Sequence, residues 1–479
     1  MIGLEIHVQL KTKSKMFCSC DNTGEDKAAN TTICPVCMGH PGTLPVPNAE
    51  AVHLGVLAAL ALNLNVNLHS KFDRKNYFYP DLPKGYQISQ YDEPLAGEGE
   101  FEVEVGGETH QIGIERLHLE EDTAKLLHQG VSTLVDFNRA GTPLMEIVTK
   151  PTIVSPAEAK AFLQELRLTM RYLGVSDADM EKGHLRCDAN ISLRPKGDTK
   201  LYPKIEVKNL NSFRAVDRAL AYEVERQTKL WEAGTPPTEQ STRGWDEKKG
   251  ITQEQRVKEA VNDYRYFPEP DIPPLELTAE QLEQWRSELP ELPAVRRNRF
   301  TKEFGLSEKD ASYLTEVQDL GDAVEQVVVV LAAELEGDTK AAAKLTANWL
   351  VHKLAAIVTE LGRPLTPLPF SVAQFADFLA LVARREVNST NAQVLLRRMV
   401  ETGKDPNTIL KEEDLSQGGG EELAQVVARV LAVYPEQALQ FKSGKEALLK
   451  FFVGAIMKET KGKVDPQVAE AELKRLIAT

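Results

Sequence analysis

The sequence predicts an α+β fold in which an antiparallel, β-rich cradle domain precedes an all-α helical domain and a small helical tail domain. Three observations support this prediction. Residues 1–290 contain short alternating segments, many Pro and Gly residues, and eight of the nine histidines. From about Leu292 onward the sequence is rich in Ala, Leu, Glu and Lys, which favour helices. A proline-dense stretch, 267–274, followed by Pro290 and Pro293, separates the two parts.

These changes of composition also predict the domain boundaries. A length of 479 residues is consistent with two to four domains of ordinary size. We expect a cradle domain at 1–290, a helical domain at 291–404 and a tail domain at 405–479. Within the tail, the pattern predicts helices at 421–433 and 445–459.

Two helices are expected inside the cradle domain. Ser155 suits an N-cap, Pro156 suits the first helical position, and Glu158 would complete a capping box. Gly174 ends that pattern. A second helix is predicted at 215–232, and the rest of the domain is predicted to form strands.

Four predicted strands carry polar side chains at every second position, which indicates one buried and one open face. The polar positions are Glu5, His7 and Gln9 in 3–10; Arg116, His118 and Glu120 in 112–120; Arg186, Asp188, Asn190, Ser192 and Arg194 in 186–194; and Lys204, Glu206 and Lys208 in 204–208. In 112–120, Ile112 and Ile114 are expected to lie on the same face as these polar residues. An ordinary solvated surface is the alternative. The residue types bind cations and phosphates, however, and together they favour an open, charged cradle.

Glu146 lies in an otherwise apolar run, 143–148. Burying an ionised carboxylate is costly unless it is paired or binds a metal. One interpretation is an edge strand with Glu146 turned outward. The other is a carboxylate ligand for a hard cation such as Mg²⁺.

Four of the five cysteines lie within twenty positions, in the order C-x-C then C-x₂-C. Cys18, Cys20, Cys34 and Cys37 can complete a closed, tetrahedral zinc site, whose role would be structural. The alternative is four reduced, buried cysteines. Cys187 is expected in the core.

Composition and missing motifs exclude several classes of protein. With 57 Lys and Arg against 71 Asp and Glu, the net charge of −14 argues against a non-specific nucleic-acid coat protein. The sequence has no apolar run long enough to span a membrane, and its first residues resemble neither a signal nor a transit peptide, so a cytoplasmic location is expected. Phosphate-binding glycine loops and kinase motifs are absent from the sequence, so a bound nucleotide would be held by metal and side chains.

Six motifs together are specific enough to indicate a family. They are GLEIHV at 3–8, CPVCMGHPG at 34–42, YFYPDLPKGY at 77–86, GTPLME at 141–146, HLRCDAN at 184–190 and DYRYFPEPD at 263–271. The chain resembles the B subunit of the aspartyl/glutamyl-tRNA amidotransferase family. The likeness covers essentially the whole chain and extends to GAIMK at 454–458 in the tail.

The resemblance implies a ligase that acts as a heterotrimer. The A subunit would hydrolyse glutamine to supply ammonia, and the C subunit would be a small belt. The B subunit would bind mischarged tRNA and use ATP to phosphorylate the side-chain carboxylate of Glu-tRNA(Gln) or Asp-tRNA(Asn). Ammonia would then displace phosphate to give the amide.

The resemblance also implies a Mg²⁺ site in the cradle. By motif position its ligands, which are also the catalytic candidates, would be Glu5, His7, Glu120, Glu146 and Asp188. His7 is a less usual Mg²⁺ ligand, and we expect it to act through water or to favour Mn²⁺.

Other residues suit the phosphates and the tRNA. Arg186, Lys208 and Asn209 are candidates for holding phosphates or the tRNA terminus. The segment with Tyr77, Phe78, Tyr79, Lys84 and Tyr86 would stack on the 3′-terminal adenosine or, equally well, form a packed aromatic loop. In the tail, the candidates for phosphate contact are Lys442, Lys445, Lys450, Lys458, Lys461 and Lys463, with a solvated helix face as the alternative.

Two other functions remain open from the sequence. A zinc-containing tRNA-binding subunit without catalysis would show tRNA affinity and no ATP turnover. A stand-alone ATP-dependent carboxylate–amine ligase would act on free glutamate and ammonia, which leaves the helical second half unexplained. The sequence does not decide between Asp-tRNA(Asn) and Glu-tRNA(Gln) as substrate.

Overall fold

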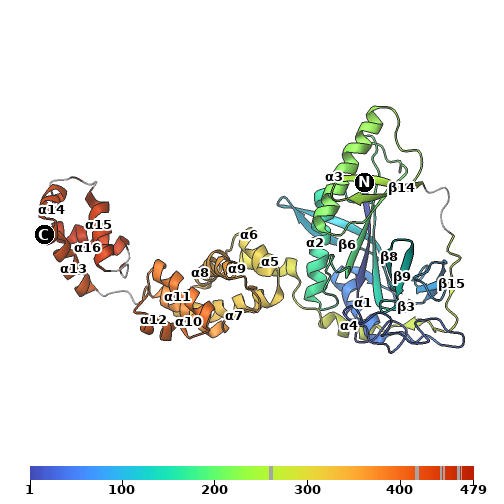
Figure 1. Cartoon of the computed structure of the whole chain (residues 1–479), viewed down its shortest axis with the longest axis horizontal. Coiled ribbons are helices and arrows are strands. Elements are labelled where there is room, and N and C mark those ends of the chain that lie inside the picture. The colour runs from blue at the N-terminus through green and yellow to red at the C-terminus, as the bar shows by residue number, and fades with distance from the viewer. Residues whose placement is uncertain are drawn as a thin grey trace. The chain divides into compact units, whose positions relative to one another are not determined.

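The computed structural model describes residues 1–257, 263–415, 420–442, 445, 448–460, 464 and 466–478. The chain forms two compact units, Met1–Pro293 and Ala294–Thr479 (Figure 1). The first unit contains the sheets and the second is helical, which confirms the predicted α+β class. The finer division at residues 404 and 405 stays a prediction.

The main sheet of the first unit has nine strands within the described residues, in the order β14-β13-β12-β11-β1-β10-β7-β6-β2. Their bounds are Ile251–Val257 (β14), Ser241–Asp246 (β13), Ile205–Lys208 (β12), Leu185–Ile191 (β11), Ile2–Gln9 (β1), Pro143–Thr149 (β10), Glu108–Glu121 (β7), Ala96–Val105 (β6) and Leu64–Val66 (β2). Neighbouring strands are antiparallel except β12 and β13, which are parallel. The sheet is therefore mixed, because helix α3 (Phe213–Glu232) connects β12 to β13 as a crossover.

Three helices pack on one face of this sheet and build the core of the first unit. Helix α1 (Ala49–Ala61) contacts β7, α2 (Pro156–Tyr172) contacts β6, and α3 contacts β11 (Figure 1). The apolar positions of β1 point into this core, where Leu4, Ile6 and Val8 are fully buried. The alternation predicted for β1 is thus confirmed, and its polar positions lie on the opposite face.

The two helices predicted for the cradle form close to their expected bounds. The prediction that the rest of the domain forms strands is wrong, because helices also form at Ala49–Ala61 and Ala279–Ser287. Ser155 caps α2 by accepting a hydrogen bond from the Glu158 backbone N–H, and Gly174 follows the helix with φ +67°. The Glu158 carboxylate accepts from the Val154 N–H instead of closing the capping box on Ser155. Helix α3 begins two residues earlier than predicted, because Ser212 provides its N-cap.

The predicted face of β7 is wrong in its first half. Ile112 and Ile114 lie in the core, and so do Leu117 and Leu119. The side chains change face between these pairs because the register with β10 shifts by one residue. Such a bulge reverses the sides to which later residues point. Arg116, His118 and Glu120 therefore lie on the polar face, and the two isoleucines do not.

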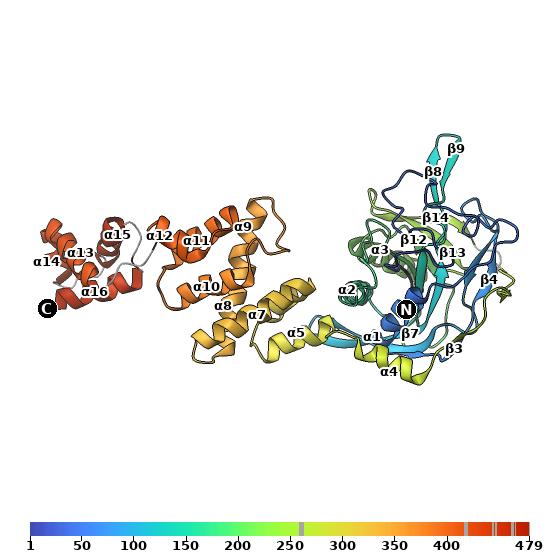
Figure 2. The same ribbon diagram turned by 90° about the horizontal axis from the view of Figure 1, so that it is seen from below.

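Smaller elements complete the first unit. They are β3 (His69–Ser70) with β16 (Leu275–Glu276), the sheet β15-β4-β5 with β15 (Phe267–Pro268), β4 (Asp73–Asn76) and β5 (Tyr86–Ser89), and helix α4 (Ala279–Ser287). Strands β8 (Lys125–Gln129) and β9 (Ser132–Asp136) form a hairpin that projects from this unit (Figure 2). Strand β5 packs against β7, which brings the three-stranded sheet next to one end of the polar face.

The second unit contains two hydrophobic clusters. Phe300, Phe375 and Leu395 are buried in the first, and Val427, Phe452 and Leu473 are buried in the second. Its helices are α5 (Pro293–Lys302), α6 (Glu308–Thr315), α7 (Gln318–Glu334), α8 (Thr339–Trp349), a π-helical turn at Leu350–Leu354, α9 (Ala355–Glu360), α10 (Val372–Ala383), α11 (Ser389–Thr402), α12 (Pro406–Glu412), α13 (Gly420–Val433), α14 (Pro435–Lys442), α15 (Leu449–Glu459) and α16 (Pro466–Ala478).

The helix predicted at 421–433 is confirmed as α13, but the start predicted at Lys445 is wrong. Helix α15 begins at Leu449. The Lys445 backbone N–H instead bonds to the Gln440 carbonyl and so closes the end of α14. Lys461 and Lys463 lie outside the described residues. None of the helices in the described ranges has both the length and the apolar character needed to cross a bilayer.

Candidate functional site

Cross-strand register gathers polar side chains in the middle of the main sheet, on the face opposite the helices. His7 of β1 lies opposite Glu146 of β10 on one side and Arg186 of β11 on the other. Glu146 in turn lies opposite His118 of β7. Residues that are far apart in sequence therefore form one row across four strands.

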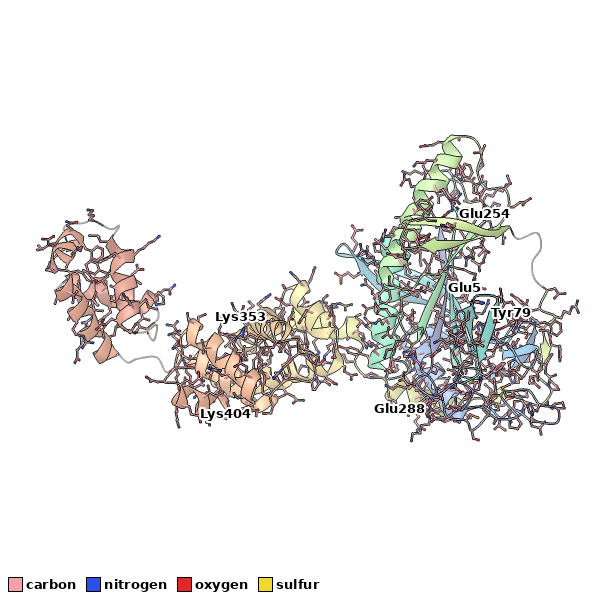
Figure 3. The ribbon with its side chains drawn as sticks, in the orientation of Figure 1. Glu5, Tyr79, Glu254, Glu288, Lys353 and Lys404 are labelled. Atoms are coloured by element: carbon pink, nitrogen blue, oxygen red, sulfur yellow. The ribbon has the colours of Figure 1, made fainter. Side chains whose placement is uncertain are left out.

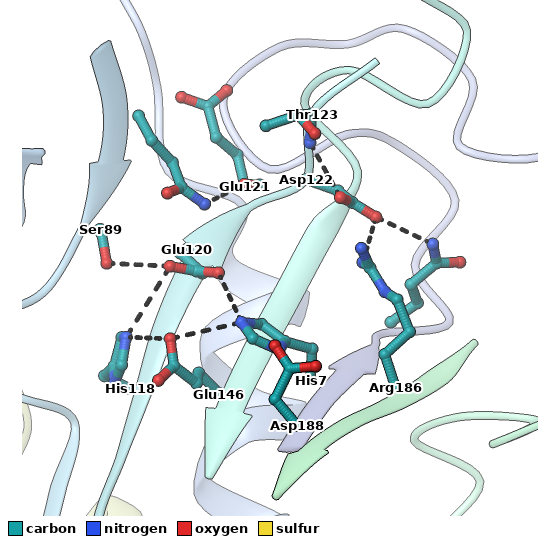
Figure 4. Close-up of polar contacts among 12 residues, drawn as sticks. His7, Ser89, His118, Glu120, Glu121, Asp122, Thr123, Glu146, Arg186 and Asp188 are labelled. Atoms are coloured by element: carbon teal, nitrogen blue, oxygen red, sulfur yellow. Dashed lines mark hydrogen bonds and ion pairs between the residues drawn. The ribbon is translucent and has the colours of Figure 1, made fainter. Parts of the chain in front are cut away.

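His7 and Glu146 of this row form a compact cluster with Glu120, which lies opposite Leu144 in the adjacent row (Figure 4). His7 Nε2 lies 3.5 Å from Glu120 Oε1 and 3.4 Å from Glu146 Oε2. Glu120 also accepts a hydrogen bond from the Ser89 hydroxyl of β5. Both carboxylates are buried, with exposed fractions of 2% and 7%. The alternative of an edge strand with Glu146 turned outward is thus wrong, because β10 pairs on both sides.

His118 is the fourth member of the cluster, and it was not among the predicted site residues. Its Nε2 lies 3.2 Å from Glu146 Oε2 and 3.8 Å from Glu120 Oε2. The buried Nδ1 has no hydrogen-bond partner within the described part of the chain. The sequence could have indicated His118, because it lies two residues before Glu120 and therefore on the same face of the strand.

The charges of this cluster shift the pKa of every member. Burial alone would lower the pKa of His118, but the carboxylates of Glu146 and Glu120 raise it to about 9. Burial would also lower the pKa of His7, which Glu146 and Glu120 raise in the same way. Burial would raise the pKa of Glu146, yet His118 and His7 hold it well below the usual range. Lys75 of β4 has a raised pKa as well, because the negative charge of Glu120 and Glu146 outweighs burial.

The cluster fits a hard divalent cation. The ligand atoms of His7, Glu120 and Glu146 all lie within 4.8 Å of one another. Adjacent ligands of an octahedral Mg²⁺ are about 3 Å apart, so His7 would have to move closer to each of the two carboxylate oxygens, which lie 3.5 and 3.4 Å from its Nε2. Two buried carboxylates side by side also need positive charge. The raised pKa values of His7, His118 and Lys75 reflect that need.

Glu5 and Asp188 lie opposite each other in the next row of the same face. Glu5 accepts a hydrogen bond from the Asn190 amide at 3.1 Å. Asp188 Oδ2 lies 2.5 Å from Lys208 Nζ, which also lies 3.2 Å from Glu206. These two predicted ligands are therefore neighbours of the cluster and not members of it, and their metal role stays a prediction.

Arg186 is held beside His7 by Asp122, a buried carboxylate outside the predicted set. The Nη2 of Arg186 donates to Asp122 Oδ2 at 2.5 Å (Figure 4). The side-chain amide of Gln9 donates to the same oxygen at 3.0 Å. Arg139 lies 3.6 Å from it. The buried Nε–H of Arg186 lacks a hydrogen-bond partner among the described residues. One donor of the guanidinium is thus unused next to the cluster.

The aromatic segment after β4 divides into packed and exposed residues. Tyr77 packs edge-to-face on Tyr264, with ring centroids 6.0 Å apart. Tyr86 lies under the Arg74 guanidinium at 4.4 Å. Phe78 and Tyr79 are exposed by 91% and 59%. Tyr79 is labelled in Figure 3. Tyr77 and Tyr86 are therefore packed, and stacking on the 3′-terminal adenosine stays a prediction for the two exposed rings.

The remaining predicted phosphate and tRNA contacts differ in how exposed their side chains are. The Lys84 side chain is largely covered and forms an ion pair with Glu121. Asn209 is exposed, with φ +65° at the end of β12. In the tail, Lys442, Lys445, Lys450 and Lys458 are all exposed. Lys84 is therefore the predicted phosphate contact that is least available to a ligand.

The four clustered cysteines form a second candidate metal site. Their Sγ atoms all lie within 4.8 Å of one another, and those of Cys34 and Cys37 are 3.9 Å apart. In a tetrahedral zinc site, Zn–S bonds of about 2.3 Å place the sulfurs about 3.8 Å apart, so the residues fit that ion. A hydrogen bond from Cys18 is the main cause that lowers the pKa of Cys37 to about 5. Burial is the main cause that raises the pKa of Cys20 to about 11. Cys187 is buried in the core, as predicted.

Comparison with known proteins identifies the family. The GatB/GatE catalytic domain matches residues 1–283, and the GatB domain matches residues 333–477. The B subunit of the aspartyl/glutamyl-tRNA(Asn/Gln) amidotransferase from Carboxydothermus hydrogenoformans is 45% identical over 485 residues, covering 100% of this chain and 98% of the relative. The protein of the same name from Thermotoga maritima is 46% identical over 484 residues, with the same coverage. The chain therefore belongs to the family of amidotransferase B subunits, as its motifs indicated.

Proposed function

We propose that this chain is the subunit of a tRNA-dependent amidotransferase that activates a tRNA-bound carboxylate. It uses ATP to phosphorylate the side chain of Glu-tRNA(Gln), Asp-tRNA(Asn) or both, and ammonia from a glutaminase partner then forms the amide. The observation that carries this proposal is the cluster of His7 with the buried carboxylates of Glu120 and Glu146 in the middle of the polar sheet face. The names of the relatives support the same activity.

A divalent cation at this site would be held by His7, Glu120 and Glu146. Glu5 and Asp188 lie in the next row of the same face and would add negative charge beside it. Mg²⁺ supplies charge neutralisation between nucleotide phosphates and the reacting carboxylate. His118 keeps Glu146 oriented, because its Nε2 lies 3.2 Å from the oxygen that also faces His7.

Other side chains of this face stabilise the charge that develops during transfer. Arg186 lies opposite His7 with its side chain partly exposed, and a planar guanidinium suits phosphoryl oxygens. Lys208 would contribute a second cation once its pairing with Asp188 is loosened by a bound metal or phosphate. Asn209 is exposed at the end of the same strand and would contact the tRNA terminus.

The proposed reaction has two balanced steps. A carboxylate oxygen of the aminoacyl side chain forms a bond to the γ-phosphorus of ATP while the bond to the ADP oxygen breaks. Ammonia then attacks the carbonyl carbon of the acyl phosphate, loses a proton, and inorganic phosphate leaves with the electron pair of the broken C–O bond. Phosphorylation is needed because a free carboxylate is a poor electrophile.

The cysteine cluster holds a structural Zn²⁺. A site closed by four thiolates leaves no position for substrate. The cluster follows β1 in sequence, so the metal would fix the loop next to the strand that carries His7.

The partners are mischarged tRNA, a glutaminase (the A subunit) and a small belt protein (the C subunit), and the complex works in the cytoplasm. The exposed Phe78 and Tyr79 offer ring faces to the 3′-terminal adenosine, whereas Lys84 would have to leave Glu121 before it could bind a phosphate. The exposed tail lysines suit the phosphate backbone. A non-catalytic tRNA-binding protein would not require two buried carboxylates at its centre.

The decisive experiment reconstitutes the chain with the glutaminase and the small belt protein. ADP release is measured with Glu-tRNA(Gln), with Asp-tRNA(Asn) and without tRNA, and amide formation is followed on each tRNA. We expect ADP release only with a mischarged tRNA, at the same stoichiometry as the amide. tRNA binding without ADP release would instead identify a non-catalytic role, and turnover with free glutamate would identify a stand-alone ligase.

A further inference from the structure

Lys15 is a fully buried lysine beside the cysteine cluster, with an exposed fraction of 0%. Its Nζ lies 3.9 Å from Cys37 Sγ and 3.4 Å from the Phe137 carbonyl oxygen. Within the described residues it forms no ion pair with a carboxylate. The nearest group that can carry negative charge is therefore a cysteine sulfur.

A buried ammonium is costly unless an opposite charge compensates it. A neutral thiol and one carbonyl oxygen are weak partners for a full positive charge. Four thiolates around one divalent ion, in contrast, leave a net charge of −2 in the same region. The positive charge of the Lys15 ammonium and the net negative charge of a metal-loaded cysteine cluster would thus compensate each other.

The backbone holds Lys15 in this position. Its N–H bonds to the Cys20 carbonyl at 2.9 Å, and the next N–H, that of Met16, bonds to the Gly141 carbonyl at 2.8 Å. Gly141 has φ +87°, and a Cβ there would lie 3.4 Å from both Cys37 Cβ and Lys15 Cδ. The segment from Phe137 to Gly141 therefore packs around the lysine and the cysteine together, just before β10.

We propose that Lys15 is the charge partner of the metal-loaded cysteine cluster and raises its affinity for the ion. The proposal rests on the zinc site proposed above. Lys15 is a positioning residue in this view: it does not ligate the ion, and its ammonium offsets the net negative charge of the loaded cluster. It also joins the metal loop to the segment that leads to Glu146.

The test compares Lys15→Met with Lys13→Met in the full-length chain. Methionine keeps most of the volume of Lys15 without its charge, and Lys13 is an exposed lysine two residues earlier. Zinc affinity is measured by competition with a chromophoric chelator. Melting curves are recorded for the metal-free and the zinc-loaded proteins.

We expect Lys15→Met to lower zinc affinity about 10- to 100-fold, the range typical of groups that act on a metal through its ligands. The gain in melting temperature on adding zinc should shrink, while the metal-free variant should melt no lower than the metal-free wild type. Lys13→Met should match the wild type in both measurements.

Two results would overturn the proposal. One is a zinc affinity of Lys15→Met equal to that of the wild type. The other is a metal-free Lys15→Met that fails to fold where the metal-free wild type folds, because the ammonium would then stabilise the fold without the ion. A wild-type protein that takes up no zinc would instead refute the zinc site itself.

Discussion

His7 and Glu146 face each other across β1 and β10, with Nε2 and Oε2 3.4 Å apart. They come from sequence positions nearly 140 residues apart. Each also contacts a second buried partner, Glu120 for His7 and His118 for Glu146. This pair lies at the centre of the proposed metal site, and the first prediction concerns it.

Glu146→Gln should abolish amide formation while tRNA binding stays close to that of the wild type. The amide cannot supply the negative charge that the cation needs, and the tail that would bind tRNA lies elsewhere in the sequence. Glu102→Gln, an exposed glutamate on β6, is the matched control. Amide formation and tRNA binding should be measured on the same preparation. Near-normal amidation by Glu146→Gln would refute the metal assignment.

Arg186→Gln should lower the rate of ADP formation more than it weakens tRNA binding. Loss of one donor that stabilises developing charge lowers kcat by about 10²- to 10³-fold in other enzymes. Arg194→Gln, at the far end of the same polar alternation, is the control and should have little effect. Steady-state kinetics with mischarged tRNA separates kcat from KM. A change confined to KM would assign Arg186 to tRNA binding instead.

Cys34→Ser should lower zinc content and melting temperature more than turnover per folded molecule. The closed cysteine site acts on the stability of the loop and not on the reacting groups. Metal analysis beside a melting curve tests this, with Cys187→Ser as a control that should retain zinc. A variant with full zinc content, or one that is stable but inactive, would contradict a purely structural site.

Glu223→Gln should reveal a pH-dependent contribution to stability. This fully buried carboxylate accepts hydrogen bonds from Arg226, Gln227 and Thr252. Burial alone would raise the pKa of Glu223, but these partners lower it. Its stabilising effect is therefore fully present above the unfolded-state pKa of about 4.3 and is lost as the pH falls through the lower folded-state value.

Urea denaturation at several pH values measures this effect. The free energy of unfolding of Glu223→Gln should be lower than that of the wild type by about 1–3 kcal/mol at pH 7. The difference should shrink as the pH falls below the unfolded-state value and through the lowered folded-state pKa of Glu223. The exposed Glu225→Gln on the same helix should change stability by less than about 0.5 kcal/mol. A difference for Glu223→Gln that does not depend on pH would contradict this account.

Lys450→Gln combined with Lys458→Gln should weaken tRNA binding and make it less sensitive to salt. Each phosphate contact that is lost should reduce the slope of log K against log [salt] by about 0.9. Lys474→Gln is the control, because Lys474 is already paired with Glu470 at 2.5 Å. Binding measured at several salt concentrations tests this, and an unchanged slope would indicate that this helix face is simply solvated.

Several features could be predicted from local sequence. The alternation of β1 and β11 is a property of consecutive residues, so the polar side of each strand was predicted correctly. The caps of α2 and the cysteine spacing are equally local. The prediction for β7 was wrong in its first half because a bulge depends on the pairing partner and not on the strand itself.

The sequence by itself determined the polar sides of β1 and β11, the start of α2 and the family that the motifs resemble, because these depend on short repeats and fixed spacings. Only the tertiary structure decided which strands are neighbours. The order β11-β1-β10-β7 brings His118 to Glu146, and it separates Glu5 and Asp188 from the cluster by one row. The pairing of Arg186 with Asp122 and of Lys208 with Asp188 followed from the same order. Strand order and register are set by contacts between distant segments, and no local pattern encodes them.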